Sequence, residues 1–394
     1  MAESILRTFL AGVAAATIAA AVFVGPASAV TVTVTGPEET VYDWSTMRCD
    51  DLDIADGVAQ AFRDSSNRVQ LITASGESRR MVGPDLSHVT RDCNTVFSSD
   101  HDPDPGHYDD VHWLAGTYTE NGQDVYALVH NEYHGFEHPG ACQTGVVRKC
   151  HQAGTTFAVS HDAGTTYTAP APPDNLVATI GPRYTNDFGR VGLYGPTAPI
   201  KKGNFYYSFT IIQQPDPQDT GVCAMRTPDI SDPKAWRGWD GASYSVRFRN
   251  PFYENTKPAS THSCEPISRD NILQIQRSVT FNTALGKYFM AGNSVKYDPS
   301  LSRYVYGFYF TTSDDLLHWS MRQLVMEVPT VTTHVCGGPD PVAYPAVLDP
   351  ASTDRNFRVS GGSTYIYYVR IHYDMLCQQT LDRDLVRIPI QIAP

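Results

Sequence analysis

Short apolar runs alternate with turn residues along almost the whole chain. The runs are rich in Val, Ile, Tyr, Phe and Thr, and they are separated by Gly, Pro, Asp and Asn. After residue 29, no long stretch repeats its apolar positions with the helical period of about 3.6 residues. This pattern is typical of many short β-strands joined by turns. We therefore predict an all-β protein.

Five pairs of apolar runs are arranged as β-hairpins. Asn121-Gly122 and Gly203-Asn204 lie between two of the pairs, and such dipeptides are strong hairpin signals. Five successive hairpins in residues 30–394 predict a single domain, a five-bladed β-propeller, because propellers have about four to eight blades. A β-sandwich or jelly roll is the alternative, since it also has many strands. The paired runs are Ala59–Arg63 with Val69–Thr73, Trp113–Tyr118 with Val125–His130, Pro196–Ile200 with Phe205–Ile212, Ser278–Asn282 with Tyr288–Asn293, and Pro345–Leu348 with Tyr365–Arg370.

A repeated turn favours the propeller. Ser160–Tyr167 and Thr312–Trp319 align without gaps: each has a hydroxyl residue, an Asp two positions later and an aromatic residue five after the Asp. Thr227–Trp236 is a looser copy. An Asp in such a turn can accept backbone N–H groups while the aromatic ring packs beneath, so we assign these turns a structural role. We also expect the run Leu385–Ile392 to close the ring by pairing with the N-terminal run Val30–Val34 or its neighbours.

The N-terminal segment predicts export. Arg7 is followed by the apolar run Phe9–Val24, and Pro26–Ala29 offers the small residues that a signal peptidase accepts. A membrane anchor is the alternative, but the run is short for a spanning helix of about 20 residues. We expect residues 1–29 to be a signal peptide and the mature protein to be secreted.

All eight cysteines lie after this segment, and in an exported chain an even number predicts disulfides. No Cys-x-x-Cys pair is present, which argues against a thiolate metal site. Proximity in the sequence suggests the pairs Cys49–Cys93, Cys142–Cys150, Cys223–Cys264 and Cys336–Cys377.

The charge pattern limits the partners. The net charge is −12, charged residues make up 18% of the chain, and no basic stripe is visible. Nucleic acid binding needs such a stripe to neutralise phosphates, so we expect no nucleic acid partner. We also expect no membrane contact after signal cleavage, and a monomer.

The hairpins nominate a site at one mouth of the propeller channel. In each blade the start of the first strand and the end of the second lie at the same face. The residues at these positions are Asp56, Asp110, Tyr194, Arg277 and Tyr344, and then His130, Glu132, His134, Gln213, Asn293 and Arg370. This set is polar and rich in aromatic rings, and convergent polar groups at such a mouth predict a binding site.

Two carboxyl groups in one funnel suit acid–base chemistry at a glycosidic bond. We predict Asp56 as the base, Glu132 as the acid, and Asp110 as the residue that tunes and orients them. Glu132 lies in a run of five hydrogen-bonding residues, His130–His134, that follows an apolar strand. Turn capping, salt bridges or hydration of the channel are the structural alternatives for these carboxylates.

The other site residues are predicted to bind substrate. Trp113, Tyr194 and Tyr344 are candidates for stacking on sugar rings, and His130, His134, Arg277 and Arg370 complete the set. No cofactor is required, although a structural calcium ion in the hub is compatible with the sequence. The loop Asp100–Gly106 has clustered carboxylates, but its prolines fit an ordinary rigid loop better.

The turns and the C-terminal segments Tyr344–Pro350, Tyr365–Tyr368 and Asp382–Val386 resemble exported bacterial five-bladed propellers of the arabinanase-, xylosidase- and invertase-like glycoside hydrolase clans. The resemblance implies a carbohydrate substrate and an Asp, an Asp and a Glu from the first three blades. Asp56 and Asp110 match the first two by position. The third blade has Tyr194-Gly195-Pro196-Thr197 where a Glu is expected, so Glu132 or Glu265 must substitute.

Three functions follow from this interpretation. The first is a secreted glycoside hydrolase acting on a polysaccharide, with furanoside linkages among the candidates. The second is a polysaccharide lyase that uses His130 or His134 with Tyr133 or Tyr194, and an arginine (Arg277 or Arg370) to neutralise the uronate. The third is a non-catalytic propeller that binds a glycan or a protein. A Ser-His-Asp hydrolase is not supported, because no Gly-x-Ser-x-Gly motif is present.

Overall fold

The computed structural model describes residues 30–146, 149–186, 189–213, 217–275 and 277–394, so the predicted signal peptide lies outside the described residues. These residues form four hydrogen-bonded sheets. The described α-helices are two of four residues each, α1 (Trp44–Met47) and α2 (Arg269–Ile272). The all-β prediction is confirmed. No described helix has the length and apolar character needed to cross a bilayer.

The sheets follow one another along the chain. The first contains β3 (Gln60–Arg63), β4 (Val69–Ile72), β5 (Glu77–Gly83) and β6 (Thr90–Ser98). The second contains β7 (Val111–Tyr118), β8 (Val125–His134), β9 (Cys150–Ser160), β10 (Leu176–Ala178), β11 (Gly189–Tyr194), β12 (Ile200–Lys202), β13 (Phe205–Gln213), β14 (Gly221–Thr227), β15 (Arg237–Trp239) and β16 (Tyr244–Arg247).

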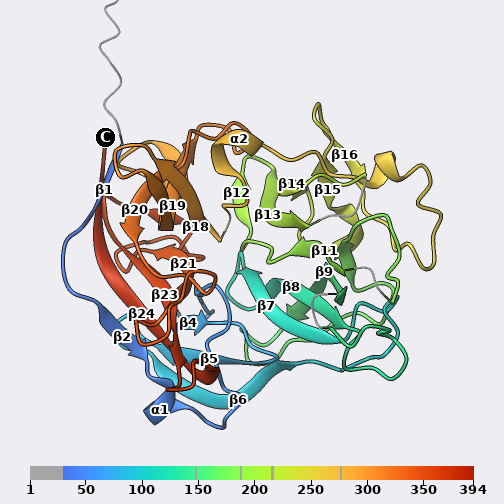
Figure 1. The fold of residues 1–394 in the computed structure, drawn as a ribbon, viewed down its shortest axis with the longest axis horizontal. Coiled ribbons are helices and arrows are strands. Elements are labelled where there is room, and N and C mark those ends of the chain that lie inside the picture. The colour runs from blue at the N-terminus through green and yellow to red at the C-terminus, as the bar shows by residue number, and fades with distance from the viewer. Residues whose placement is uncertain (1–29, 147–148, 187–188, 214–216, 276) are drawn as a thin grey trace, which may run out of the picture.

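The remaining two sheets complete the fold. The third contains β17 (Ser278–Asn282), β18 (Lys287–Asp298), β19 (Arg303–Ser313), β20 (Gln323–Glu327) and the short β22 (Val359–Ser360). The fourth contains β21 (Val342–Leu348), β23 (Ser363–Tyr373), β24 (Gln379–Ala393), β1 (Thr31–Val34) and β2 (Glu39–Tyr42). Figure 1 shows the sheets arranged in chain order around a common centre.

All five predicted hairpins pair antiparallel: β3 with β4, β7 with β8, β12 with β13, β17 with β18, and β21 with β23. The predicted closure is also present, because β1 pairs with β24 from Thr31 opposite Ala393 to Val34 opposite Ile390. The first and last described strands therefore lie in one sheet.

The third hairpin differs from the prediction in its first strand. A single strand was expected over Pro196–Ile200, but β11 and β12 pair with opposite ends of β13. Gly195, whose φ is +52°, and Pro196 interrupt the ladder between them, since Pro has no N–H to donate. This interruption brings Tyr194 and Gly195 to the centre of the molecule.

The outer turns have the predicted structural role, with one correction. Asp162 Oδ1 accepts the N–H groups of Thr165 and Thr166 at 3.0 and 2.9 Å, as expected. In the second copy, Asp315 Oδ1 accepts the N–H groups of Leu317 and His318. The gapless alignment pointed to Asp314 instead, which makes an ion pair with Lys287 on the surface. The second turn is one residue shorter between its Asp and its aromatic ring.

The cysteines form the four predicted disulfides, Cys49–Cys93, Cys142–Cys150, Cys223–Cys264 and Cys336–Cys377. No free cysteine remains among the described residues, which include all eight.

The hydrophobic core is divided into clusters, each of which joins neighbouring groups of strands. Phe62 and Ile72 of the first sheet pack with Leu114 and Val129 of β7 and β8. Four further clusters join β7–β10 to β11–β14, β12–β14 to β17–β19, β18–β19 to the fourth sheet, and the fourth sheet to β3–β5. Burial of these apolar side chains supplies most of the free energy that stabilises the folded state. The polar residues gather instead at the centre, where the sheets meet.

Candidate active site

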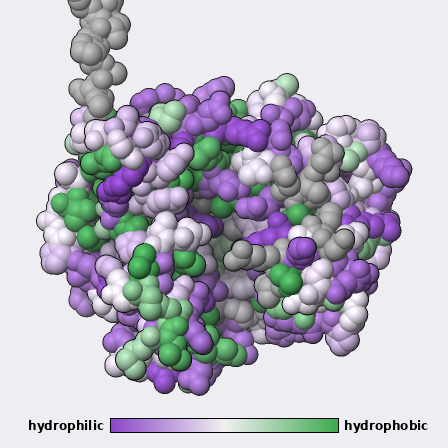
Figure 2. All heavy atoms as spheres, viewed as in Figure 1, coloured by the Kyte–Doolittle hydropathy of each residue, from purple (hydrophilic) through white to green (hydrophobic). Residues whose placement is uncertain are grey.

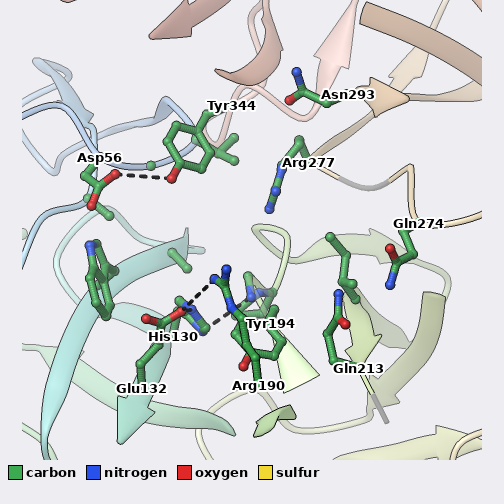
Figure 3. A pocket seen from close by; sticks show the side chains of 18 residues that line it. Asp56, His130, Glu132, Arg190, Tyr194, Gln213, Gln274, Arg277, Asn293 and Tyr344 are labelled. Atoms are coloured by element: carbon green, nitrogen blue, oxygen red, sulfur yellow. Dashed lines mark hydrogen bonds and ion pairs between the residues drawn. The ribbon is translucent and has the colours of Figure 1, made fainter. Parts of the chain in front are cut away.

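A cavity of about 470 Å³ lies where the four sheets meet. Figure 2 shows the molecule hollowed near the middle of the face in view. Lining residues come from strands of the second, third and fourth sheets and from the segments that flank β3 and β4 of the first, and Figure 3 shows their side chains converging. The lining consists of Asp56, Gly57, Val58, Ala74, Trp113, Ala115, His130, Glu132, Arg190, Tyr194, Gly195, Pro196, Ile211, Gln213, Gln274, Arg277, Asn293 and Tyr344.

Most of the predicted site residues reach this cavity. Those that line it are Asp56, Glu132, His130, Trp113, Tyr194, Arg277 and Tyr344, together with Gln213 and Asn293. Asp110, His134 and Arg370 are not part of the lining. Glu265, the other candidate for the third acidic residue, is exposed and also lies outside it.

Strand β8 places its polar residues by simple alternation. Successive side chains of a strand point to opposite faces, so His130, Glu132 and His134 share one face. Strand β9 adds His151 directly opposite His134 in the antiparallel register. The prediction missed His151 because its contribution depends on this pairing.

Glu132 is held by a group of histidines. Its Oε1 lies 2.9 Å from Nε2 of His130, and its Oε2 lies 3.1 Å from Nε2 of His134 and 2.9 Å from Nε2 of His151. The backbone N–H of Gly195 donates to Nδ1 of His130 at 3.3 Å, which leaves Nε2 of His130 to donate to Glu132. Burial alone would raise the pKa of Glu132, but the histidine contacts outweigh it, and the pKa lies well below its usual value. Glu132 is therefore the ionised carboxyl group of the cavity.

The surroundings of Asp56 shift its pKa in the opposite direction. Tyr344 donates its hydroxyl to Asp56 Oδ1 at 3.2 Å, and Arg383 from β24 donates to the same oxygen. Burial raises the pKa of Asp56 above its usual value, and the Glu132 charge adds to this although Arg383 and Tyr344 oppose it. Asp56 is therefore the carboxyl group of the cavity that tends to hold a proton.

Asp110 lies behind the cavity wall and is only 1% exposed. The backbone N–H of His134 donates to its Oδ2 at 2.7 Å, and Nε2 of His138 lies 3.0 Å from the same oxygen. Asp110 thus fixes the end of β8 two residues beyond Glu132. Asp110 does not line the cavity itself, and it affects the site only by holding this strand end in place.

The remaining predicted groups have protein partners outside the cavity. Arg370 makes an ion pair with Glu38 at 2.6 Å. The hydroxyl of Tyr133 donates to the carbonyl of Pro103 at 3.0 Å, and that of Tyr194 donates to the carbonyl of Val191 at 3.2 Å. Both tyrosine hydroxyls are therefore engaged by the backbone.

Two groups of described residues have the composition of metal ligands: Glu132 with His134 and His151, and His372 with Asp382 and Asp384. The first does not suit the calcium ion allowed for in the hub, because calcium prefers an all-oxygen shell and this group offers two imidazoles. Its imidazoles face the Glu132 carboxylate, and Nδ1 of His134 also lies 3.2 Å from Glu137.

The described residues thus form an all-β fold of sheets around a central cavity that contains two carboxyl groups of opposite protonation tendency. No family model matches the chain, and no curated protein matches it. Solved structures with a similar fold include the catalytic domain of the GH62 α-L-arabinofuranosidase from Coprinopsis cinerea, with 10% identity over 91% of this chain and 96% of that chain and a TM-score of 0.47. The endo-arabinase from Bacteroides thetaiotaomicron has 13% identity over 90% of this chain and 97% of that chain, with a TM-score of 0.43.

Proposed function

We propose that residues 30–394 form one secreted five-bladed β-propeller that acts as a glycoside hydrolase on a polysaccharide, with furanoside linkages among the candidates. The blade count treats the ten-stranded sheet as two blades, β7–β10 and β11–β16. Among the described residues, the backbone ladder between these two halves is the parallel pairing of β9 with β11, which is four residue pairs long. The five core clusters between neighbouring strand groups support the same division.

One observation carries the proposed reaction: the cavity contains two carboxyl groups whose surroundings move their pKa values in opposite directions. Such pairs divide acid and base roles between them. Asp56 is assigned as the acid that protonates the leaving oxygen, and Glu132 as the ionised base or nucleophile. This assignment exchanges the two roles expected from the sequence.

The rest of the lining fits a sugar. Trp113 and Tyr194 present aromatic rings, on either side of the His130 ring at 5.5 and 5.6 Å between centroids. Aromatic faces bury the apolar faces of a sugar, and amides and guanidinium groups hydrogen-bond to its hydroxyls. Asp110 acts as a positioning residue, since it holds the strand end that carries Glu132.

In this scheme a glycosidic oxygen takes the proton of Asp56 as the bond to the anomeric carbon breaks. Glu132, which stays ionised, either removes a proton from an attacking water or attacks the anomeric carbon itself. The two routes differ in the separation of the carboxyl groups, about 6.5–9.5 Å for inversion and about 5–5.5 Å for retention. Proton NMR of the first product distinguishes them by its anomeric configuration.

The lyase alternative has less support, because the hydroxyls of Tyr133 and Tyr194 are engaged by backbone carbonyls. A binding protein would need no pair of carboxyl groups with divergent pKa values.

The test is release of reducing sugars from a panel of polysaccharides by the wild type, Asp56→Asn and Glu132→Gln. Asp314→Asn, at an exposed outer turn, is the matched control. We expect activity in the wild type and the control and its loss in both cavity variants. Activity retained in both variants would contradict the assigned residues, and no release from any substrate would contradict the enzyme class.

A further inference from the structure

Arg277 is a charged group of the cavity to which the fold gives no counter-ion. It precedes β17, lines the cavity and extends into it (Figure 3). Among the described residues it makes no ion pair, and its guanidinium packs over the ring of Tyr344 at 5.4 Å. The buried Arg322 and Arg358 also lack an ion pair, but neither lines this cavity, whereas Arg277 does. A guanidinium that is partly removed from bulk water without a negatively charged partner is costly. Such a group is best explained by a ligand that supplies the negative charge.

A second guanidinium lies in the same cavity. Arg190 of β11 is 58% exposed, packs over the ring of Tyr194 at 5.0 Å, and its nearest described carboxylate oxygen is Oε1 of Glu132 at 3.7 Å. The positive charge of Arg190 contributes to the lowered pKa of Arg277, after burial itself. The two groups are therefore close enough to repel each other, and an anion between them would remove that repulsion.

Among the described lining residues, those on the same side of the cavity as Arg277 include no acid. Figure 3 shows Gln213, Gln274 and Asn293 on the same side of the cavity, opposite Asp56 and Glu132. We call Arg277 and these three amides the cationic wall, and Asp56 with Glu132 the acidic wall. The lining carries two guanidinium groups, Arg190 and Arg277, whereas its two carboxyl groups face partners of their own, Asp56 facing Arg383 and Glu132 facing three histidines.

We propose that the cationic wall, with Arg190, binds an anionic substituent of the sugar, so that the substrate is an acidic glycan. This inference rests on the proposed function for the role of the cavity. A carboxylate of a uronic acid and a sulfate ester share the required chemistry, since the planar fork of Arg matches two oxygens of either. The N–H groups of the three amides can supply further hydrogen bonds to the same anion.

The test is calorimetric binding of matched oligosaccharides. One arm uses a uronate oligosaccharide before and after reduction of its carboxylates to alcohols, and the other uses a sulfated oligosaccharide before and after desulfation. The proteins are the wild type, Arg277→Gln, Arg277→Lys, and Arg303→Gln as a control in an exposed ion pair with Glu327. Circular dichroism confirms folding.

We expect the wild type and the control to prefer one anionic form, and Arg277→Gln to lose about 10- to 100-fold in affinity for that form only. Arg277→Lys keeps the charge and should recover part of the loss, and added salt should weaken only the anionic arm. The arm that shows the preference identifies the source of the anion. Equal affinity for charged and neutralised forms in both arms, or an equal loss on both forms, would overturn the inference.

The binding result is separate from the proposed reaction. If the protein binds the anionic form without producing a new reducing end, the acidic subsite is kept and the hydrolase is rejected. Products that absorb through a new double bond would have the same meaning, because they indicate elimination and not hydrolysis. Hydrolysis of neutral glycans with no effect of Arg277→Gln would keep the hydrolase and reject the subsite.

Discussion

The two walls of the cavity differ in how far the protein itself satisfies their charges. On the acidic wall, Glu132 faces three histidines and Asp56 accepts from Tyr344 and Arg383. On the cationic wall, Arg277 has no ionic partner among the described residues. Groups that must keep a fixed protonation state need partners before the substrate arrives, because preorganised contacts set their pKa. Groups that recognise a substrate must stay open to it.

The largest expected effect tests which residue of the acidic wall is the acid and which is the base or nucleophile. Glu132→Gln should lower kcat/KM by about 10² to 10⁴-fold on any glycoside, because it removes the ionised group itself. Asp56→Asn should cause a comparable loss on a natural glycan but a much smaller loss on an aryl glycoside, whose leaving group departs without protonation. Kinetics of both variants on both substrates make the measurement.

The opposite pattern would restore the roles expected from the sequence. If Glu132→Gln were the variant rescued by the better leaving group, Glu132 would be the acid. Asp314→Asn, on the outer turn, should match the wild type on both substrates and controls for expression and folding.

A smaller effect is expected when one partner of the acidic wall is removed. His151 is 4% exposed and contributes to the lowered pKa of Glu132. In His151→Asn the pKa of Glu132 should rise, so the ionised form is lost at a higher pH on acidification and the acid limb of kcat/KM moves to higher pH. We also expect a loss of about 10-fold at the optimum.

The measurement is the pH profile of kcat/KM for His151→Asn beside the wild type. His161→Asn changes an exposed histidine at an outer turn and should leave the profile unchanged. An acid limb that stays in place would show that His151 does not tune Glu132.

The features that could be predicted from the sequence are those that depend on local properties of the chain. Hairpins, disulfides and the shared face of His130, Glu132 and His134 depend on turns, proximity and alternation, which are local properties. Arg190 was missed because the first strand of its hairpin was placed after Gly195 and not before it. Asp110 was expected in the funnel, but the end of β8 covers it.

The protonation roles could not be predicted for a different reason. Asp56 depends on Arg383, which is 327 residues away in the sequence, and Glu132 depends on the pairing of β8 with β9. Burial and partner charges of this kind exist only after folding. Both carboxyl groups predicted from the sequence line the cavity, but the roles predicted for them are the reverse of those that we propose.

A substitution on the cationic wall should change the affinity for substrate and leave the turnover number unchanged. Asn293→Ala removes an amide that lines this wall. If its hydrogen bonds are equally strong to the substrate and the transition state, KM should rise about 3- to 10-fold while kcat stays unchanged. Steady-state kinetics test this, with the exposed Asn204→Ala as control. A fall in kcat at constant KM would place Asn293 in the chemical step and weaken the contrast between the walls.

The smallest effect at the optimum is expected for Tyr344→Phe, which deletes one hydroxyl donor of the acidic wall. Asp56 is faced by Arg383, Tyr344, Trp113 and the Glu132 charge, and the Tyr344 hydrogen bond lowers its pKa. Without it the pKa of Asp56 should rise further, so the protonated acid persists to higher pH and the alkaline limb of kcat/KM moves upward. Activity at the optimum should stay within about threefold of the wild type. A limb that moves downward would mean that the alkaline limb reports a base, and Asp56 would lose its assignment as the proton donor; Tyr304→Phe, at an exposed tyrosine, should leave it unmoved.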